Sequence, residues 1–443
     1  MIIDLNKNER RIVIERYTRP EMGKIWAEEN KFRIWLDIEI LACEAQAQLG
    51  VIPSAAVKTI REKASFNIKR ITEIENEVKH DVIAFLTNVG ENIGPESRFV
   101  HLGMTSSDVL DTALSVQMKQ SGELLLNDLV VLKDVLARRA KEFRNTVMVG
   151  RTHGIHAEPV TFGLKLALWY AETLRNIERL KSATAAISVG KISGSVGTYQ
   201  HLDPFVEKYV CEKLGLKPSP ISTQVLQRDR HAEFMNALAV GGCSLEKFAT
   251  EIRHLQKTEV LEAEEYFSKG QKGSSSMPHK RNPVASERIA GLSRVLRGNA
   301  VAAMENVALW HERDITHSSV ERVIVPDSCI VYDYILTQFT KIIDTLLVYP
   351  ERMLKNLDRT NGLVFSQEVL LALTKKGMKR EDAYRIVQER AMKVWENGSD
   401  FRELIGASEE VSKLLSKADL DELFDPKRSL KQVDYIFERT GLN

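Results

Sequence analysis

The chain has 443 residues, with 62 Lys and Arg residues against 61 Asp and Glu residues, and 43% of its residues are hydrophobic. A chain of this length exceeds one simple core, and its ordinary balance of charged and apolar residues excludes an intrinsically disordered protein. The net charge of +1 argues against a dedicated nucleic-acid-binding protein, which usually has a strong basic excess, but it allows a local basic pocket.

The N-terminus, MIIDLNKNERR, lacks the apolar stretch and small-residue cleavage site of a secretory signal. No stretch approaches the roughly 20 apolar residues that a membrane-spanning helix needs. None of the four cysteines lies in a C-x-x-C pair, so neither a zinc knuckle nor a redox motif is expected. We therefore expect a cytoplasmic protein with buried thiols, and neither nucleic acid nor membrane as a partner.

Three regions follow from the positions of the prolines and the spacing of apolar residues. Residues 1–105 are predicted to form an N-terminal domain of shorter helices. Residues 106–350 are predicted to form a central bundle of long helices, because apolar residues recur every three or four positions along 125–143 and 162–180. Residues 351–443 are predicted to form a C-terminal helical domain. Strand signals are scarce and no Asn-Gly hairpin joins alternating runs, so the expected fold class is all-α.

Long bundle helices have a consequence for the oligomeric state. Such helices expose apolar stripes on more than one side, and one chain often cannot cover all of them. Self-association into a larger bundle is the favoured interpretation. The alternative is a monomer in which the terminal regions cover the stripes.

The most unusual segment is SKGQKGSSSMPHKRNP, residues 268–283, which interrupts the helical periodicity. One interpretation is a mobile basic surface loop, as for most Gly- and Ser-rich segments. However, Asn282 and Pro283 form a favourable cap and first-turn pair for the next helix, and Lys280 lies beside that helix N-terminus. Because a helix N-terminus attracts anions, the segment is also typical of a lid over an anion-binding active site.

The segment GRTHGIHAEP, residues 150–159, places His153 and His156 three residues apart. Glu158 could complete a ligand set, but no further spacing indicates one, so a metal site is disfavoured. The simpler interpretation of either histidine is a hydrogen-bonded loop residue.

Three other segments combine histidines, hydroxyls and cations. HLGMTSSDV, residues 101–109, by itself predicts only a helix cap. KHDV, residues 79–82, places a histidine beside a lysine. HERDITHSSVERVIVPD, residues 311–327, groups Arg and Ser residues that suit phosphate or carboxylate binding, and the alternative is a solvated, salt-bridged helix face.

Together these segments resemble the fumarase/aspartase superfamily over the whole chain. GSSSMPHKRNP, residues 273–283, matches the signature G-S-S-x-x-P-x-K-x-N-P, and the TSSD and RTHGIHAEP segments match its two other shared regions in the same order. Within the superfamily the chain is most similar to the adenylosuccinate lyase family, through RYTRPEM at residues 16–22, KHDV and HERDITHSSVER. The form MPHKRNP alone does not decide this, because carboxymuconate cycloisomerases share it.

The resemblance implies three helical domains with a central long-helix bundle. It implies β-elimination of fumarate from adenylosuccinate to give AMP, and from SAICAR to give AICAR, in purine nucleotide biosynthesis. It implies neither a cofactor nor a metal. It also implies a homotetramer in which three subunits build each active site.

The resemblance further implies roles for individual residues. Ser274 would be the general base, with Ser275 as the alternative, and His153 the general acid. His80 would assist the acid or bind substrate, and Glu287 would orient a histidine, although a carboxylate in a first helical turn is common in any case. The expected substrate-binding residues are Arg16, Tyr17, Lys79, Asp81, His101, Thr105, Ser106, Gln224, Ser275, Lys280, Asn282, Arg288, Arg313, Ser318 and Arg322.

Two rival functions remain at this point. A cycloisomerase of the carboxymuconate type would leave the Arg16–Tyr17 and Ser318–Arg322 clusters without a purpose, because its substrate carries no purine nucleotide. A non-enzymatic scaffold that retains the fold is disfavoured by the intact Ser274, Lys280, Asn282 and His153.

Overall fold

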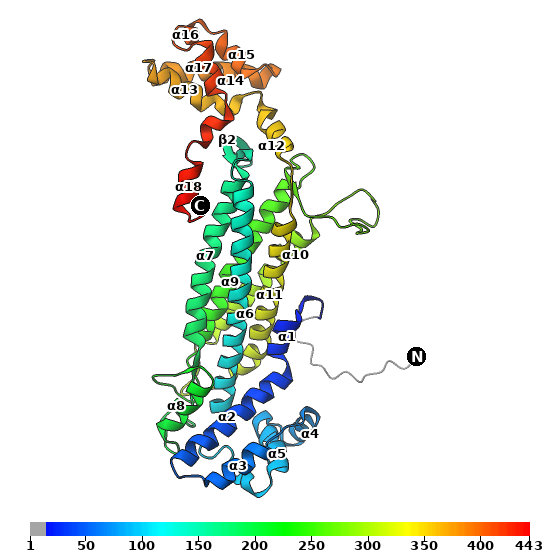
Figure 1. Cartoon of the computed structure of the whole chain (residues 1–443), viewed down its shortest axis with the longest axis vertical. Coiled ribbons are helices and arrows are strands. Elements are labelled where there is room, and N and C mark those ends of the chain that lie inside the picture. Colours follow the sequence, from blue (N-terminus) through cyan, green and yellow to red (C-terminus); the bar gives the residue numbers. More distant parts are fainter. Residues whose placement is uncertain (1–14) are drawn as a thin grey trace. The chain divides into compact units, whose positions relative to one another are not determined.

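The computed structural model describes residues 15–443, so the N-terminal segment in which no secretory signal is expected lies outside the described residues. The described chain is predominantly helical, with three short two-stranded pairings (Figure 1). This confirms the all-α fold class predicted from the apolar periodicity. Within residues 15–443, no helix is both long and apolar enough to cross a membrane.

The chain folds into two compact units, each assembled from three stretches of sequence. The first unit contains residues up to Val130, 175–246 and 288–338, and the second contains residues 131–174, 247–287 and 339–443. Five long helices contribute residues to both units: α6 Ser106–Glu142, α7 Phe162–Ile187, α9 Asp229–Leu255, α10 Val284–Glu305 and α11 Thr316–Thr345.

The first unit also holds the shorter N-terminal helices. They are α1 Pro20–Trp26, α2 Glu28–Gln48, α3 Ser54–Lys63, α4 Ile68–Val78 and α5 Asp81–Ile93, together with α8 Pro204–Lys213. Their core is aromatic: Phe32 stacks on Phe85 with ring centroids 5.7 Å apart, and Trp35 meets Phe85 edge-on at 5.4 Å. Pro53 directly precedes α3, since its fixed φ suits a helix start.

The second unit has an aromatic core and a set of short C-terminal helices. Trp169, Phe248 and Phe339 contact one another, with Trp169 stacked on Phe248 at 4.9 Å. The short helices are α12 Pro350–Leu357, α13 Ser366–Lys375, α14 Arg380–Asn397, α15 Phe401–Gly406, α16 Glu409–Ser412, α17 Lys417–Leu423 and α18 Val433–Arg439.

The strands are few, but one pair changes the expectation for a predicted site. β1 Val147–Thr152 pairs antiparallel with β2 Ile155–Thr161, so residues 150–159 form a hairpin and not an irregular loop. The other pairs have two residues per strand: β3 Val189–Gly190 with β4 Lys217–Pro218, and β5 Ala263–Glu264 with β6 Leu347–Val348.

Candidate active site

The predicted active-site residues are divided between the two units. The first unit carries those of the TSSD, KHDV and HSSVER segments, and the second carries the hairpin histidine and the serine-rich loop. Each unit is therefore described by itself below.

The serine-rich loop of the second unit is tied to itself at its base. The side-chain amide of Asn282 donates to the carbonyl oxygen of Gly273 at 2.9 Å. A Cβ atom on Gly273 would lie 2.0 Å from the carbonyl oxygen of Lys280, so only glycine permits this approach. The segment projects as an extended loop before α10 (Figure 1), and Ser275 and Lys280 are exposed on it. The loop therefore has a closed base and an accessible tip, as a lid requires.

Ser274 lies inside this loop with its hydroxyl oxygen in contact with backbone donors. The Oγ atom accepts hydrogen bonds from the amides of Ser276 at 3.3 Å and Met277 at 3.1 Å. Donors directed at a hydroxyl oxygen favour its deprotonated form. The local fold thus supplies one of the conditions that a serine base needs.

The N-terminus of α10 differs from the prediction. The sequence predicts Asn282 as the cap, but the carboxylate of Glu265 accepts hydrogen bonds from the amides of Ser286 at 2.7 Å and Ala285 at 3.3 Å. The Asn282 side chain is engaged with Gly273 instead. The anion site at this helix start is therefore occupied by a carboxylate of the chain itself, and Lys280 is one of several exposed cations on the loop, with Lys269, Lys272 and Arg281.

His153 lies at the tip of the β1–β2 hairpin. Thr152 pairs with Ile155, so His153 and Gly154 form a two-residue turn, and their φ angles are +54° and +81°. Positive φ at both central positions defines a type I′ turn, which histidine tolerates better than most residues. The turn holds the His153 side chain exposed at the end of a rigid ribbon.

The hairpin is fixed close to its turn by a partly buried ion pair. Arg151 donates to both carboxylate oxygens of Glu262, at 2.7 and 2.9 Å, and Asn356 donates to the same carboxylate at 2.8 Å. His156 lies on β2, and no group of three potential metal-binding side chains occurs among residues 15–443.

In the first unit, the KHDV segment forms the junction between α4 and α5. Lys79 ends α4 with a φ of +56°, and His80 caps α5 by accepting a hydrogen bond from the amide of Ile83 at 3.3 Å. Asp81 is paired with Arg322 of α11. Burial alone would raise the pKa of Asp81, but the charge and hydrogen bond of Arg322 lower it overall. The structure thus brings together two predicted substrate-binding residues that are far apart in the sequence.

His101 is held by a carboxylate of α2. Its backbone amide and its Nδ1 atom contact the two oxygens of Glu39, at 2.9 and 2.6 Å. Burial alone would lower the pKa of His101, but the hydrogen bond and charge of Glu39 raise it above its ordinary value. The local geometry therefore favours a cationic His101.

Arg288 and Tyr17, two predicted site residues, both contact Tyr334, which the sequence analysis did not single out. The hydroxyl of Tyr334 accepts a hydrogen bond from Arg288 at 2.8 Å, and its ring lies 5.0 Å from that of Tyr17. Arg19 anchors the Tyr17 segment by donating to Asp333 at 2.7 Å. No sequence signal identifies Tyr334, because it lies inside the regular α11 pattern.

Thr105 and Gln224 form a third contact within the first unit. The amide of Gln224 donates to the hydroxyl of Thr105 at 3.4 Å. Ser106 begins α6, and Ser318 lies in the first turn of α11. Within residues 15–443, no hydrogen bond or ion pair joins Arg16 or Arg313 to another predicted site residue.

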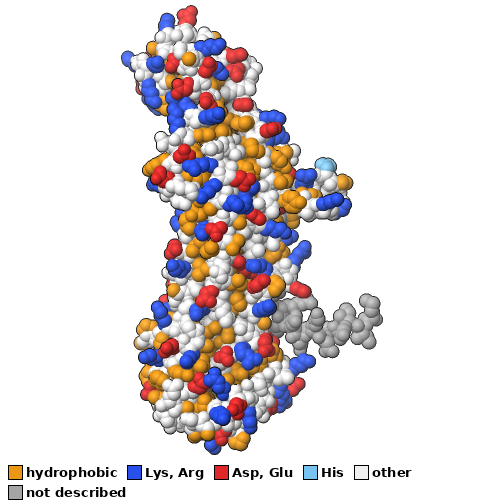
Figure 2. Space-filling model, viewed as in Figure 1, with side chains coloured by type: hydrophobic (Ala, Val, Ile, Leu, Met, Phe, Trp, Pro, Cys, Tyr) orange, Lys and Arg blue, Asp and Glu red, His pale blue; other side chains and the backbone are white. Residues whose placement is uncertain are grey.

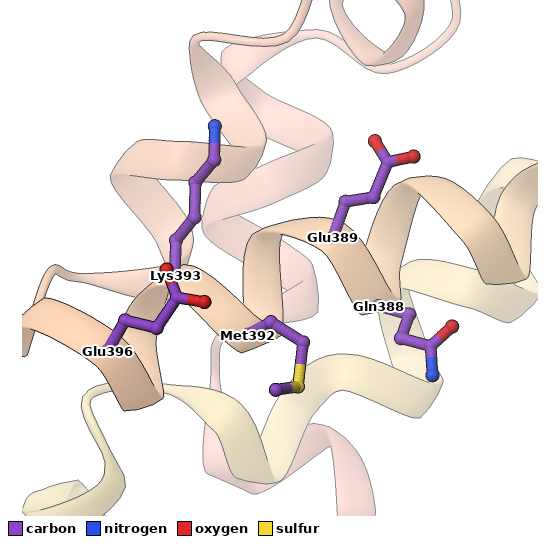
Figure 3. A pocket seen from close by; sticks show the side chains of 5 residues that line it. All are labelled: Gln388, Glu389, Met392, Lys393 and Glu396. Atoms are coloured by element: carbon purple, nitrogen blue, oxygen red, sulfur yellow. The ribbon is translucent and has the colours of Figure 1, made fainter.

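A surface hollow beside α14 is unrelated to these residues. Figure 3 shows its lining side chains, all from this one helix, and they include none of the predicted site residues: Gln388, Glu389, Met392, Lys393 and Glu396. It lacks the convergent groups of an active site.

The helical fold, the serine-rich loop and the hairpin histidine define a lyase of the fumarase type. The family described as "Lyase" matches residues 15–298, and the family described as "Adenylosuccinate lyase C-terminus" matches residues 362–440. The chain belongs to the adenylosuccinate lyase family.

Full-length relatives agree with this assignment. The adenylosuccinate lyase of Bacillus subtilis (strain 168) is 58% identical over 430 residues, which cover 97% of this chain and 100% of that protein. The structure of a fumarate lyase from Mesorhizobium sp. BNC1 matches with a TM-score of 0.88 and 27% identity, over 96% of this chain and 98% of that one. A 3-carboxy-cis,cis-muconate lactonizing enzyme from Pseudomonas putida matches with a TM-score of 0.87 and 30% identity, over 96% of both chains.

Proposed function

We propose that the protein is a carbon–nitrogen lyase that releases fumarate from adenylosuccinate to give AMP, and from SAICAR to give AICAR. The observation that carries this function is the 58% identity to the Bacillus subtilis adenylosuccinate lyase over nearly the whole chain. The muconate lactonizing enzyme shares the fold but only 30% of its residues. Both reactions belong to purine nucleotide biosynthesis, and a cytoplasmic location is part of the proposal.

The elimination requires a base, and we assign Ser274 to this role, with Ser275 as the alternative. The base removes a proton from the carbon beside a substrate carboxylate, which becomes a dianion that cations must stabilise. A serine hydroxyl is a poor base in water and needs desolvation and nearby donors. The two backbone amides at the Ser274 oxygen support the assignment. Closure of the loop would exclude water and bring Lys280 and Asn282 to the substrate carboxylates.

The leaving nitrogen of the purine requires an acid, and His153 is assigned to it. Its exposed position on a rigid turn supports this role, since proton transfer depends on a fixed distance to the leaving atom. His80 would assist the acid, and Glu287 would orient a histidine.

A phosphate and two carboxylates of the substrate require several cations and hydroxyls. Arg–carboxylate and Arg–phosphate pairs are strong because two parallel hydrogen bonds form. The residues that we assign to binding are Arg16, Tyr17, Lys79, Asp81, His101, Thr105, Ser106, Gln224, Ser275, Lys280, Asn282, Arg288, Arg313, Ser318 and Arg322. The paired Asp81 and Arg322 would have to exchange partners or act together on substrate binding.

We further propose a homotetramer with shared active sites. Exposed apolar side chains along α10, including Val295, Val301 and Met304, support it, and hydrophobic side chains interrupt the charged surface over the long helices (Figure 2). Exposed apolar patches of this kind are typical of interfaces. The division into domains 1–105, 106–350 and 351–443 stays a prediction.

The direct test is an assay of the purified protein with adenylosuccinate and without added metal, followed by the absorbance change on formation of AMP. Turnover is expected, and Ser274→Ala should reduce kcat by about 10²–10⁴-fold while substrate still binds. If Ser274→Ala retained near-native kcat, Ser275 would become the candidate base. An inactive wild-type protein that instead converted a carboxymuconate would contradict the proposal.

A further inference from the structure

Beneath Thr105 and Gln224 lies a buried ion pair that none of the roles above includes. The Nζ atom of Lys191 is 2.6 Å from Oδ1 of Asp108, and both side chains are fully buried. Replacing such a pair with apolar residues is often neutral or stabilising, so its presence is weak evidence for a role in stability. Its other hydrogen bonds indicate a role in position.

Lys191 uses its ammonium group to hold two irregular segments. Besides Asp108, it donates to the carbonyl oxygens of Gln224 at 2.9 Å and Gly194 at 3.1 Å. An ammonium group has three donors, so these bonds leave none free. Lys191 is thereby occupied as a brace and cannot itself bind a substrate carboxylate.

Asp108 holds the backbone of Thr105, whose side chain contacts that of Gln224. Its carboxylate accepts hydrogen bonds from the amides of Thr105 at 2.8 Å and Ser193 at 3.0 Å. The pair therefore fixes the backbone of both Thr105 and Gln224, whose side chains are 3.4 Å apart.

A second buried pair fixes the chain on the far side of Gln224. Asp111, one turn further along α6, accepts a hydrogen bond from the amide of Leu226 at 2.7 Å and pairs with Arg228 at 2.6 Å. Arg228 donates to the carbonyl oxygen of Leu226 at 2.8 Å and to Glu321 of α11 at 2.9 Å. The segment around Gln224 is thus held at Gln224 by Lys191, the partner of Asp108, and at Leu226 by Asp111 and Arg228.

We propose that Lys191 is a positioning residue for substrate binding, acting through Gln224 and Thr105. This inference rests on the proposed function, since Gln224 and Thr105 are assigned there to the substrate. Gln224 lies outside regular secondary structure. The orientation of its side chain therefore depends on the hydrogen bonds that hold the backbone of residues 224–226. Lys191 acts before substrate arrives and touches no reacting atom.

A double-mutant cycle tests the proposal. Lys191→Met, Gln224→Ala and the double variant are compared by kcat/KM for adenylosuccinate, because residues that act through one another give non-additive losses. Lys191→Met should lower kcat/KM by about tenfold in the wild-type background, mainly through KM, and by less than about twofold in the Gln224→Ala background. Equal losses in both backgrounds would overturn the proposal, because they would mean that Lys191 stabilises the fold without aiming Gln224.

Two further measurements keep the outcome decisive. Thr112→Val is the milder variant should Lys191→Met fail to fold, since the Thr112 hydroxyl bonds the backbone nitrogen and oxygen of Lys191 at 3.1 and 2.9 Å. Hydrogen exchange without substrate should be faster at the amides around residue 224 in either variant, and unchanged exchange there would also overturn the proposal. The control is Lys165→Met, which removes a lysine paired with Glu251 at 2.7 Å and should alter neither measurement.

A wild-type protein without turnover would contradict the proposed function alone. Hydrogen exchange would still show whether Lys191 holds the backbone around residue 224.

Discussion

At the scale of single residues, substitutions of His153 can distinguish its role in the reaction from its role in the hairpin turn. Asn favours the left-handed conformation at this position, whereas Ala pays a conformational cost of roughly 1 kcal/mol. We expect His153→Asn to keep the wild-type Tm and His153→Ala to lower it slightly. Both should reduce kcat by about 10²–10⁴-fold, because neither side chain can donate a proton. Substantial turnover by His153→Asn would contradict the assignment of the general acid.

The contact between His101 and Glu39 predicts a stability that depends on pH. Because the folded-state pKa of His101 is raised, its contribution is fully present below the ordinary value of about 6.5 and is lost as the pH rises through the folded-state pKa. Glu39→Gln should therefore lower the free energy of unfolding by about 1–3 kcal/mol at pH 5.5, and by less at pH 8.5. Urea unfolding at the two values measures this difference.

The control for that experiment is Glu91→Gln, which breaks an exposed carboxylate pair with Arg70. The pKa of Glu91 is lowered, mainly by its hydrogen bond with Arg70, so its contribution is lost only in acid. Its effect should be the same at pH 5.5 and pH 8.5. A Glu39→Gln effect that is also independent of pH would mean that Glu39 does not raise the pKa of His101 in the folded protein.

The sequence predicted these residues by motif, but their contacts were beyond its reach. The TSSD, KHDV and serine-rich segments made Thr105, His80 and Ser274 candidates, because such motifs are local in the sequence. Tyr334 and Glu265 act through partners that only the tertiary fold brings near. A Tyr in a helical pattern, or a Glu ahead of a loop, has no local feature that distinguishes it from an ordinary surface residue.

At the scale of elements, the start of α10 depends on a residue from the other side of the loop. Glu265→Ala would leave the amides of Ala285 and Ser286 without their acceptor. We expect a loss of about 0.5–2 kcal/mol in the free energy of unfolding, the usual cost of removing an N-terminal cap. Thermal unfolding measures it, with Glu305→Ala at the other end of α10 as the control. No loss from Glu265→Ala would mean that water replaces the carboxylate at equal free energy.

The elements themselves were predicted to different extents. The apolar spacing predicted α6 and α7, because a long stripe at helical period has few alternative structures. It missed the β1–β2 hairpin, since the turn uses His-Gly where Asn-Gly is the usual signal. Proline was a weaker guide than expected, because α11 continues through Pro326. Tertiary packing over 30 residues can sustain a helix that local preference would end.

At the scale of the whole molecule, the apolar side chains on α10 predict an assembly that one substitution can break. Val301 is 53% exposed, and Val51, in a loop of the first unit, is 57% exposed. If α10 lies in a subunit interface, Val301→Glu should place a charge in an apolar contact and dissociate the tetramer, with loss of activity. Val51→Glu should leave both unchanged. Light scattering measures the mass, and a Val301→Glu tetramer would argue against an interface at this position.

A shared active site makes a stronger prediction than assembly alone. If His153 and Ser274 of one active site come from different subunits, two inactive variants can restore each other. Homotetramers of His153→Asn and of Ser274→Ala should each be inactive, whereas co-refolded mixtures should contain some sites with both native residues. Activity should therefore rise from near zero to a substantial fraction of the wild-type value and should be greatest near equal proportions. Mixed tetramers, verified by a mass tag on one variant, that remain inactive at every ratio would show that each chain supplies both residues to its own site. That result would leave the lyase assignment intact, because the reaction requires only that the acid and the base lie in the same active site. It would also mean that activity does not require residues from a second subunit of the tetramer.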